Sequence, residues 1–367
     1  MKTTQILAII FVMLIAGCTP TGKVVDAEPL KVKIGVSLPL TGPAAPTAHW
    51  ILNGIDLALE RLPENERARI QLVVENDESK PDTGLSIAHK FVEIDGINYV
   101  IGPLSSAVTV PTAQYYDDNK VLRMHPGAGV ESTITQGKYR FFLLGKVEPW
   151  MKTLAEYAYD DEIKTMSILY LDDEYGRDNL KWFEHYFQGD ILAKESFLRG
   201  DNDFRTQLLK IKKSNPDAVF LISLGPALTN ALKQMNELGI NKKKLSLINT
   251  EDTEIVKAAG SLVEGVIYPT ITDQSESEIK EWFAKRYQEK FDAPHEAVAA
   301  SSFDSFNILW NAIKKCGNDV DCTTTEISSI KAYAGASGII SVDEQGVGMR
   351  NPAIKTVKNG SFVYAGS

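Results

Sequence analysis

The sequence lacks the signatures of several large enzyme classes. It has no G-x-S-x-G, G-x-x-x-x-G-K-[ST] or H-E-x-x-H pattern, which argues against an α/β-hydrolase, a P-loop enzyme and a zinc protease. Its five histidines, at positions 49, 89, 125, 185 and 295, are too scattered along the chain to indicate a catalytic or metal-binding group. The sequence therefore predicts no catalytic residue, no metal site and no cofactor.

Positive charge is not in excess. The chain carries 39 Lys and Arg against 48 Asp and Glu, a formal net charge of −9, which becomes −10 if a leader containing Lys2 is removed. A nucleic-acid-binding surface needs clustered basic residues, so that function is not indicated. Any attachment to a membrane has to come from lipid and not from charge.

The apolar run near the N-terminus, Ile6 to Ala16, is short. Its eleven residues are too few to span a bilayer core as a helix, which takes roughly 20. With Lys2 before it and Gly17 and Cys18 after it, the segment has the layout of a secretory signal. We predict that residues 1–17 are removed, which leaves enough chain for two domains of ordinary size.

The cleavage region, Ile15-Ala16-Gly17-Cys18, resembles the bacterial lipobox, in which the cysteine thiol is acylated. This predicts a lipid anchor at Cys18 on the outer face of the cytoplasmic membrane, facing a periplasm or the cell surface. The alternative is an ordinary signal peptide followed by a chance cysteine. Residues 18–30 are small and polar without periodicity, as a flexible tether would be.

Cysteine is otherwise scarce. The two that remain, Cys316 and Cys322, flank the short polar loop Gly317 to Asp321. In an exported chain such a close pair predicts a local disulfide, with two free thiols as the alternative. A metal site is disfavoured because no histidine lies nearby.

From Lys31 onward, short β-rich runs alternate with segments of helical periodicity, which is typical of an α/β protein with parallel sheets. The expected strands are almost entirely apolar, as strands covered on both faces must be. They are Lys31–Leu38, Ile70–Glu75, Tyr99–Gly102, Val121–Met124, Met166–Leu171, Ile191–Phe197, Ala218–Leu224, Leu245–Asn249 and Gly265–Tyr268.

After the last of these strands the alternation stops. Two long helices are predicted over Ser277–Phe291 and Glu296–Lys315 with no strand between them, followed by a helix near Thr324–Tyr333. The C-terminal stretch contains Asp-Glu-Gln-Gly and Lys-Asn-Gly turns, which predict β-hairpins.

Five phrases stand out in the body of the chain: GVSLPLTGPAA at 35–45, VIGPLSS at 100–106, LDDEYGRD at 171–178, NDFRTQLLKIKKSNPDAVFL at 202–221 and ALKQMNELGI at 231–240. In order and spacing they resemble the branched-chain amino-acid binding proteins, a family of type I periplasmic solute-binding proteins. The resemblance extends from about Lys31 to the C-terminus, and the loop KKCGNDVDC recurs in relatives of the family.

The resemblance implies two Rossmann-like lobes with parallel sheets, joined by a three-strand hinge, with the ligand between them. Lobe 1 would contain residues 31–144 and 274–337, and lobe 2 residues 145–273 and 338–367. It also implies a solute-binding protein of an ABC importer, which closes around an amino acid or similar small polar solute and then docks on a membrane permease.

On lobe 1, the strand ending at Gly102 leads into Ser105 and Ser106, and Ser106 matches the family serine that contacts a ligand α-carboxylate. The alternative is a plain helix N-cap. After the next strand, Gly127, Ala128 and Gly129 allow the backbone to approach a ligand closely. The threonine that the family offers there is absent.

On lobe 2, Tyr175 matches a family tyrosine that faces the cleft, with lobe packing as the alternative. Glu251 is the best candidate for an acid that pairs with a ligand ammonium, because such a pair gives strength and orientation in a dry cleft. Asp252 and Glu254 are close enough to take that role, and a solvated loop is the alternative for all three.

Other cleft positions depart from the amino-acid pattern. Thr47 stands where a tyrosine is usual, and Leu224 where another aromatic is usual. Trp50 either lines the pocket or belongs to the lobe core, and His125 lies near the predicted cleft. The candidate ligands are therefore an amino acid, a peptide fragment, an amide or a small carboxylate.

Two other functions are open. The chain could serve as the ligand-sensing subunit of a separate membrane receptor, or as an extracytoplasmic hydrolase on a similar frame, because fold alone does not fix function. The missing catalytic motifs disfavour the hydrolase, so we predict a binding protein and not an enzyme.

Overall fold

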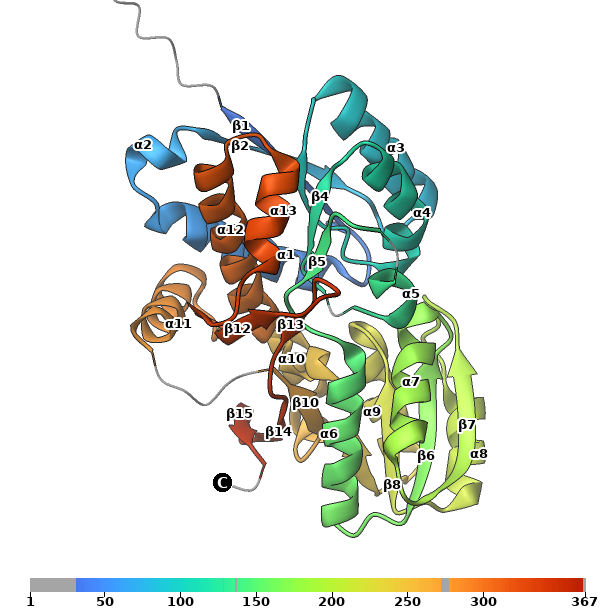
Figure 1. Cartoon of the computed structure of the whole chain (residues 1–367). Coiled ribbons are helices and arrows are strands. Elements are labelled where there is room, and N and C mark those ends of the chain that lie inside the picture. The colour runs from blue at the N-terminus through green and yellow to red at the C-terminus, as the bar shows by residue number, and fades with distance from the viewer. Residues whose placement is uncertain (1–30, 128, 136, 272–276, 366–367) are drawn as a thin grey trace, which may run out of the picture. The chain divides into compact units, whose positions relative to one another are not determined.

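The computed structural model describes residues 31–127, 129–135, 137–271 and 277–365 (Figure 1). The predicted signal peptide, the tether with Cys18, and Ala128 lie outside the described residues. In the described ranges, no helix combines the length and the hydrophobicity that crossing a bilayer requires.

The first sheet has five strands in the order β2-β1-β3-β4-β5, all parallel (Figure 1). Its strands are β1 (Val32–Leu38), β2 (Ile70–Asn76), β3 (Tyr99–Ile101), β4 (Leu122–His125) and β5 (Arg140–Phe142). The intervening helices are α1 (Ala45–Arg61), α2 (Glu64–Arg67), α3 (Pro81–His89), which continues as a π-helical turn at Lys90–Ile94, α4 (Ser106–Asp118) and α5 (Glu131–Ile134). Strands β3 and β4 are buried throughout; β3 is entirely apolar, whereas β4 also carries the buried side chains of Arg123 and His125.

The second sheet has seven strands in the order β15-β14-β10-β9-β8-β6-β7. Five are parallel: β6 (Thr165–Leu171), β7 (Asp190–Phe197), β8 (Ala218–Ile222), β9 (Lys243–Leu245) and β10 (Ile267–Thr270). Two antiparallel strands, β14 (Ala353–Lys358) and β15 (Ser361–Tyr364), complete one edge. The helices of this part are α6 (Val147–Asp160), α7 (Glu174–Tyr186), α8 (Arg205–Ser214), α9 (Pro226–Glu237) and α10 (Thr253–Ala259). The predicted α/β fold with parallel sheets is confirmed.

The chain passes between the two sheets three times. It leaves the first sheet after β5, and after β10 it continues into α11 (Glu278–Phe291) and α12 (Ala297–Cys316), of which α12 packs along α1. It then forms α13 (Val320–Ser328) and the small sheet of β11 (Tyr333–Gly335), β12 (Gly338–Val342) and β13 (Gly348–Met349), before β14 joins the second sheet. The predicted lobe boundaries at residues 144 and 337 stay predictions, and the one at 273 lies outside the described residues.

The sequence prediction was wrong at three places. Strand β5 was missed because it is only three residues long and begins with the charged Arg140. The strand predicted to continue to Asn249 ends at Leu245, and a 3-10 helix follows over Ile248–Glu251, where polar residues replace the apolar run. The last predicted helix ends at Ser328, so that Tyr333 belongs to β11.

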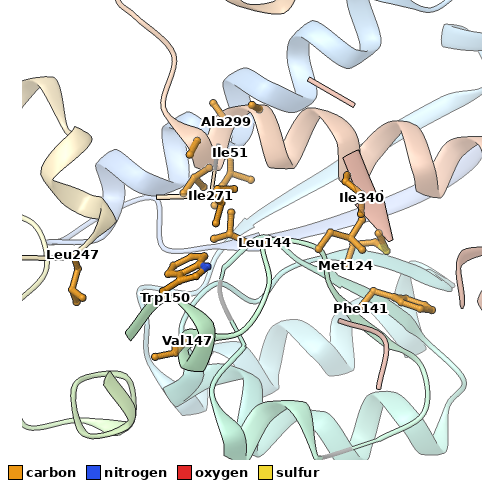
Figure 2. Packing of buried hydrophobic residues seen from close by; sticks show 14 of the residues in the cluster. Ile51, Met124, Phe141, Leu144, Val147, Trp150, Leu247, Ile271, Ala299 and Ile340 are labelled. Atoms are coloured by element: carbon orange, nitrogen blue, oxygen red, sulfur yellow. The ribbon is translucent and has the colours of Figure 1, made fainter. Parts of the chain in front are cut away.

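The largest cluster of buried apolar side chains in the described residues extends from one sheet to the other. Figure 2 shows its central part, where Ile51 of α1 and Ala299 of α12 lie near Leu144 and Trp150. Leu144 follows β5 on the first passage between the sheets, and Trp150 lies in α6, which comes after that passage. The start of this passage is therefore part of the buried core.

A buried polar cluster ties two of the passages to α12. Arg350 donates from Nε to the Leu143 carbonyl at 2.8 Å and from Nη1 to the Ser337 carbonyl at 2.7 Å. The carboxylate of Asp304 on α12 accepts from the amides of Ala336 and Ser337 at 2.7 and 2.8 Å. Burial lowers the pKa of Arg350 to about 10, so its guanidinium stays charged at neutral pH.

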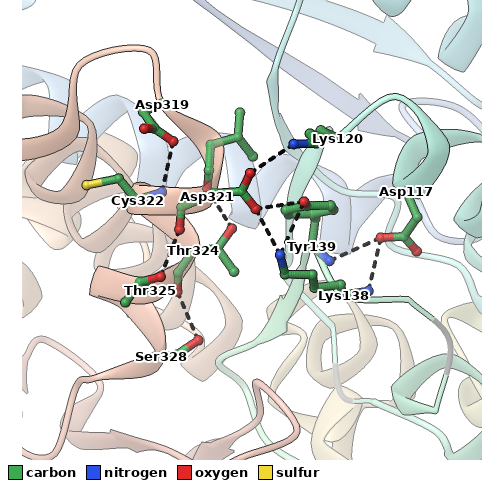
Figure 3. Close-up of polar contacts among 11 residues, drawn as sticks. Asp117, Lys120, Lys138, Tyr139, Asp319, Asp321, Cys322, Thr324, Thr325 and Ser328 are labelled. Atoms are coloured by element: carbon green, nitrogen blue, oxygen red, sulfur yellow. Dashed lines mark hydrogen bonds and ion pairs between the residues drawn. The ribbon is translucent and has the colours of Figure 1, made fainter.

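The predicted disulfide is present between Cys316 and Cys322. It lies at the start of α13, whose Asp321 faces the first sheet (Figure 3). The Asp321 carboxylate accepts from Lys138 Nζ and Tyr139 OH at 2.8 Å and from Lys120 Nζ at 3.0 Å. These donors hold the pKa of Asp321 well below its usual range.

Candidate ligand-binding cavity

A cavity of about 360 Å³ lies at the carboxyl ends of the parallel strands of both sheets. Each of the strands β1 to β9 is followed by a segment that contributes to its wall. From the first sheet these include Thr47, Ser79, Ser106, Gly127 and Leu144, and from the second Tyr175, Arg199, Leu224 and Ile248. Ligands of open α/β sheets bind beyond the carboxyl ends of the strands, so the topology marks this cavity as the candidate site.

A larger cavity, about 740 Å³, is a weaker candidate. Among its lining residues are Gly145, Ser337 and Arg350, which belong to the passages between the sheets, and the exposed side chains of Ile339 and Met349. Of the parallel strands, only β5 and β10 lead into it. The smaller cavity is therefore the better candidate for the ligand-binding site.

Five helices begin at the smaller cavity. The N-cap residues of α1, α4, α7 and α9 line it, and these are Ala44, Ser105, Asp173 and Gly225. The fifth helix, α12, contributes its second residue, Val298. The first amides of a helix lack partners within the helix, and they carry a partial positive charge.

Ser105 and Ser106 reach the cavity through a tight turn after β3. Gly102 has a φ of +115°, and a Cβ on it would lie 2.1 Å from the Ser37 carbonyl oxygen, so only glycine fits. The peptide bond from Gly102 to Pro103 is cis. Ser105 is the N-cap residue of α4, but its side chain accepts no capping hydrogen bond. Both serines are thus placed beside uncapped helix amides.

The second sheet contributes two ion pairs to the rim. Asp172 accepts from Arg177 at 2.7 Å, and Asp173 accepts from Arg199 at 2.5 Å. Asp173 also caps α7, because its other oxygen accepts from the Gly176 amide at 2.9 Å. The two arginines were not predicted as site residues: Arg199 comes just after the predicted strand that ends at Phe197, and Arg177 lies within α7.

Tyr175 lines the cavity, and its predicted contact with a ligand stays a prediction. Burial raises the pKa of its phenol, which therefore stays neutral and can donate or accept a hydrogen bond. Thr47 lines the cavity from α1, and Leu224 lines it from the turn before α9.

Glu251, the predicted ammonium partner, does not line the cavity. Its side chain is buried in a network of its own, where Oε1 accepts from Lys355 Nζ at 2.9 Å and Oε2 from the Ala297 amide at 3.4 Å. The two neighbouring acids do not line it either: Asp252 caps α10 by accepting from the Glu254 amide, and Glu254 pairs with Lys257. The structure therefore brings none of the three acids into the cavity.

The match to known proteins extends over most of the chain. Residues 31–361 match the family model described as periplasmic binding protein. The chain belongs to this family.

Individual relatives agree with that assignment. The Leu/Ile/Val-binding protein homolog 1 of Brucella abortus is 26% identical over 325 residues, covering 86% of this chain and 87% of that protein. The leucine binding protein LivK of Thermotoga maritima has a TM-score of 0.85 at 25% identity, covering 91% of this chain and 97% of its own. A solute binding protein of an ABC transporter from Rhodopseudomonas palustris was solved in complex with 3,4-dihydroxybenzoic acid. It has a TM-score of 0.82 at 22% identity, covering 90% of this chain and 95% of its own. The resemblance to the branched-chain amino-acid binding proteins is confirmed.

Three further predicted positions, Gly127, Ala128 and Gly129, follow β4 in the sequence of this periplasmic binding protein. Gly127 lines the cavity, Ala128 is outside the described residues, and Gly129 lies off the wall, where its amide donates to the Gly145 carbonyl at 2.9 Å. Trp50 is partly buried and packs against the core instead of lining the cavity.

His125 also packs. Its ring stacks on Phe142, and its Nδ1 lies 3.1 Å from the Pro103 carbonyl oxygen. Burial lowers the pKa of His125 to about 3, so the ring is neutral at physiological pH. Across the part of the chain that the structure describes, no three His, Cys, Asp or Glu side chains are grouped to hold a metal ion.

Proposed function

We propose that this periplasmic binding protein is the extracytoplasmic solute-binding subunit of an ABC importer. It captures a small carboxylate-bearing solute in the cavity between its two sheets and does not turn that solute over. The observation that carries the proposal is the convergence of nine strand ends and five helix N-termini on one cavity of about 360 Å³.

Capture involves closure of the two halves about the passages between the sheets. In the arrangement that the structure shows, the two halves touch at the edge between them: the Glu131 amide of α5 donates to the Asp178 carboxylate of α7 at 3.3 Å, and Glu131 pairs with Lys181. On another part of the rim, the Gly225 backbone approaches the Pro43 carbonyl so closely that a Cβ would lie 2.6 Å from it. A ligand that contacts both halves stabilises the closed arrangement.

A carboxylate is the group that the ligands in the relatives' names share. Leucine, isoleucine and valine carry one, and so does 3,4-dihydroxybenzoic acid. In this chain, Ser105, Ser106 and the first amides of α4 offer hydrogen-bond donors for such a group. We therefore assign this end of the cavity to the ligand carboxylate.

The subunit is held at the outer face of the cytoplasmic membrane by lipid on Cys18, with residues 18–30 as the tether. Its partner is a membrane permease. A Cys18→Ser variant, expressed in the native host, is expected in the soluble extracytoplasmic fraction. Retention of that variant in the membrane fraction would contradict the anchor.

Binding is tested with the purified chain by a thermal-shift screen against amino acids, small amides and carboxylates. A ligand that binds only the folded state raises the melting temperature by mass action. We expect a shift from a carboxylate-bearing compound, with no product formed. Chemical conversion of any compound that binds would replace the proposal by an enzyme function.

A further inference from the structure

We infer that the ligand is a small apolar carboxylic acid without an ammonium group. The inference rests on the proposed function and narrows its substrate class. It follows from how the charged groups around the cavity are already paired.

The five helix N-termini at the cavity are not neutralised equally. Two of them bind a protein carboxylate: Asp173 accepts from the Gly176 amide of α7, and Glu251 accepts from the Ala297 amide of α12. The other three, those of α1, α4 and α9, have no side-chain cap. The partial positive charge of these three helices favours a negative group in the cavity and disfavours a cation.

The acids that line the cavity are not available to an ammonium. Asp173 has one oxygen on the Gly176 amide and the other on Arg199, and Asp172 is paired with Arg177. The third, Glu174, is exposed, where water screens its charge. On the side of the first sheet, the described lining residues are all uncharged.

Glu251 is neutralised from within the protein. It lies directly behind the wall, because it binds the amide of Ala297 and the next residue, Val298, lines the cavity. Its partner is the ammonium of Lys355, whose side chain is only 14% exposed. The protein thus supplies its own cation to the acid that an amino-acid ligand would otherwise have to use.

The rest of the wall is suited to an apolar body. It contains Leu104, Leu144, Trp150, Leu224, Ile248 and Val298. A buried ammonium among such side chains would lose its hydration without gaining a paired acid, which is costly. A carboxylic acid with an aliphatic or aromatic body would place its carboxylate at the uncapped helix N-termini and its body against these apolar side chains.

The test compares compounds that differ only in the ammonium group. The affinity of the purified chain is measured by calorimetry for 4-methylpentanoate against L-leucine, and for 3-phenylpropanoate against L-phenylalanine. We expect each acid to bind at least about tenfold more tightly than its amino acid, a factor that corresponds to about 1.4 kcal/mol. The neutral 4-methylpentanamide should bind more weakly than 4-methylpentanoate.

Two variants locate the effect. Ser106→Ala should weaken 4-methylpentanoate binding, whereas Ser86→Ala on the exposed face of α3 should leave it unchanged. If the amino acids bind as tightly as the acids or more tightly, the inference is overturned while the solute-binding function stands. If neither acids nor amino acids bind, both are overturned.

Discussion

The N-termini of α4 and α12 face the same cavity but differ in what neutralises them. At α12, the amide of Ala297 binds the Glu251 carboxylate, which is buried and balanced by Lys355. At α4, Ser105 is the N-cap residue, and its side chain makes no capping bond. Equivalent helix ends can therefore serve different purposes. The N-terminus of α12 is committed to a carboxylate of the protein, whereas the N-terminus of α4 has no side-chain cap and is available to the proposed ligand.

The largest effect is expected on the free energy of unfolding, from a change at the committed N-terminus of α12. Glu251→Ala leaves the Lys355 ammonium buried without its acid, and breaking a buried ion pair by removing one partner costs about 3 to 5 kcal/mol. We expect a loss of this size in the free energy of unfolding, measured by chemical denaturation.

The matched control is Glu254→Ala, three residues along the chain. Glu254 and its partner Lys257 are both exposed, so this change should stay within about 0.5 kcal/mol. Equal losses in the two variants would show that Glu251 is not the committed acid.

A second effect at the same helix end depends on pH. Glu296 precedes α12 and accepts from Tyr287 OH at 2.8 Å, and burial raises its pKa from 4.5 to about 7. Between these two values the unfolded chain releases a proton that the folded chain keeps, so this group makes stability fall as the pH rises from 4.5 to about 7. Glu296→Gln removes that fall, and at about pH 8 it should stabilise the chain by on the order of 3 kcal/mol.

The measurement is the free energy of unfolding of both forms across this pH range. Near pH 4 the two should be similar, because the carboxyl of Glu296 is then protonated in both states. A variant that is no more stable than the natural chain above neutral pH would contradict the buried, proton-retaining carboxyl.

At the available helix end the effect should fall on binding and not on stability. Ser106→Ala removes one donor to the ligand carboxylate, and a hydrogen bond to a charged group contributes about 1.5 to 3 kcal/mol. We expect the affinity for the best-bound carboxylate to fall about tenfold or more by calorimetry. The melting temperature without ligand should hardly change, and a large drop there would instead assign Ser106 to the fold.

The smallest effect is expected at α7, which is intermediate because its cap, Asp173, also lines the cavity. Asp173→Asn keeps a capping acceptor for the Gly176 amide but removes a negative charge and releases Arg199. Carboxylate binding should tighten about threefold, in line with single charges near helix ends. Weaker binding in this variant would show that Asp173 itself contacts the ligand.

The sequence predicted the features that depend on local pattern. Apolar runs located most strands of both sheets, and the turn from Gly102 to Ser106 placed two serines at the cavity, as did the phrase around Tyr175. These residues follow the carboxyl ends of parallel strands, the place where ligands of open α/β sheets bind, and their role in binding stays a prediction.

The pairing of Glu251 within the protein could not be predicted from the sequence. Its partner Lys355 lies 104 residues away along the chain, on a strand that completes the second sheet from the C-terminal segment. The Ala297 amide comes from a third region, at the start of α12. Pairing between such distant segments depends on tertiary structure, and no local pattern indicates which acid is already neutralised.

The most direct test is a crystal structure of the chain with 4-methylpentanoate. The central prediction is that the carboxylate lies at the N-terminus of α4, within hydrogen-bond distance of Ser106 Oγ, with the Glu251–Lys355 pair intact behind the wall. A carboxylate bound in the larger cavity beside Arg350, or one that displaces Lys355 from Glu251, would contradict it.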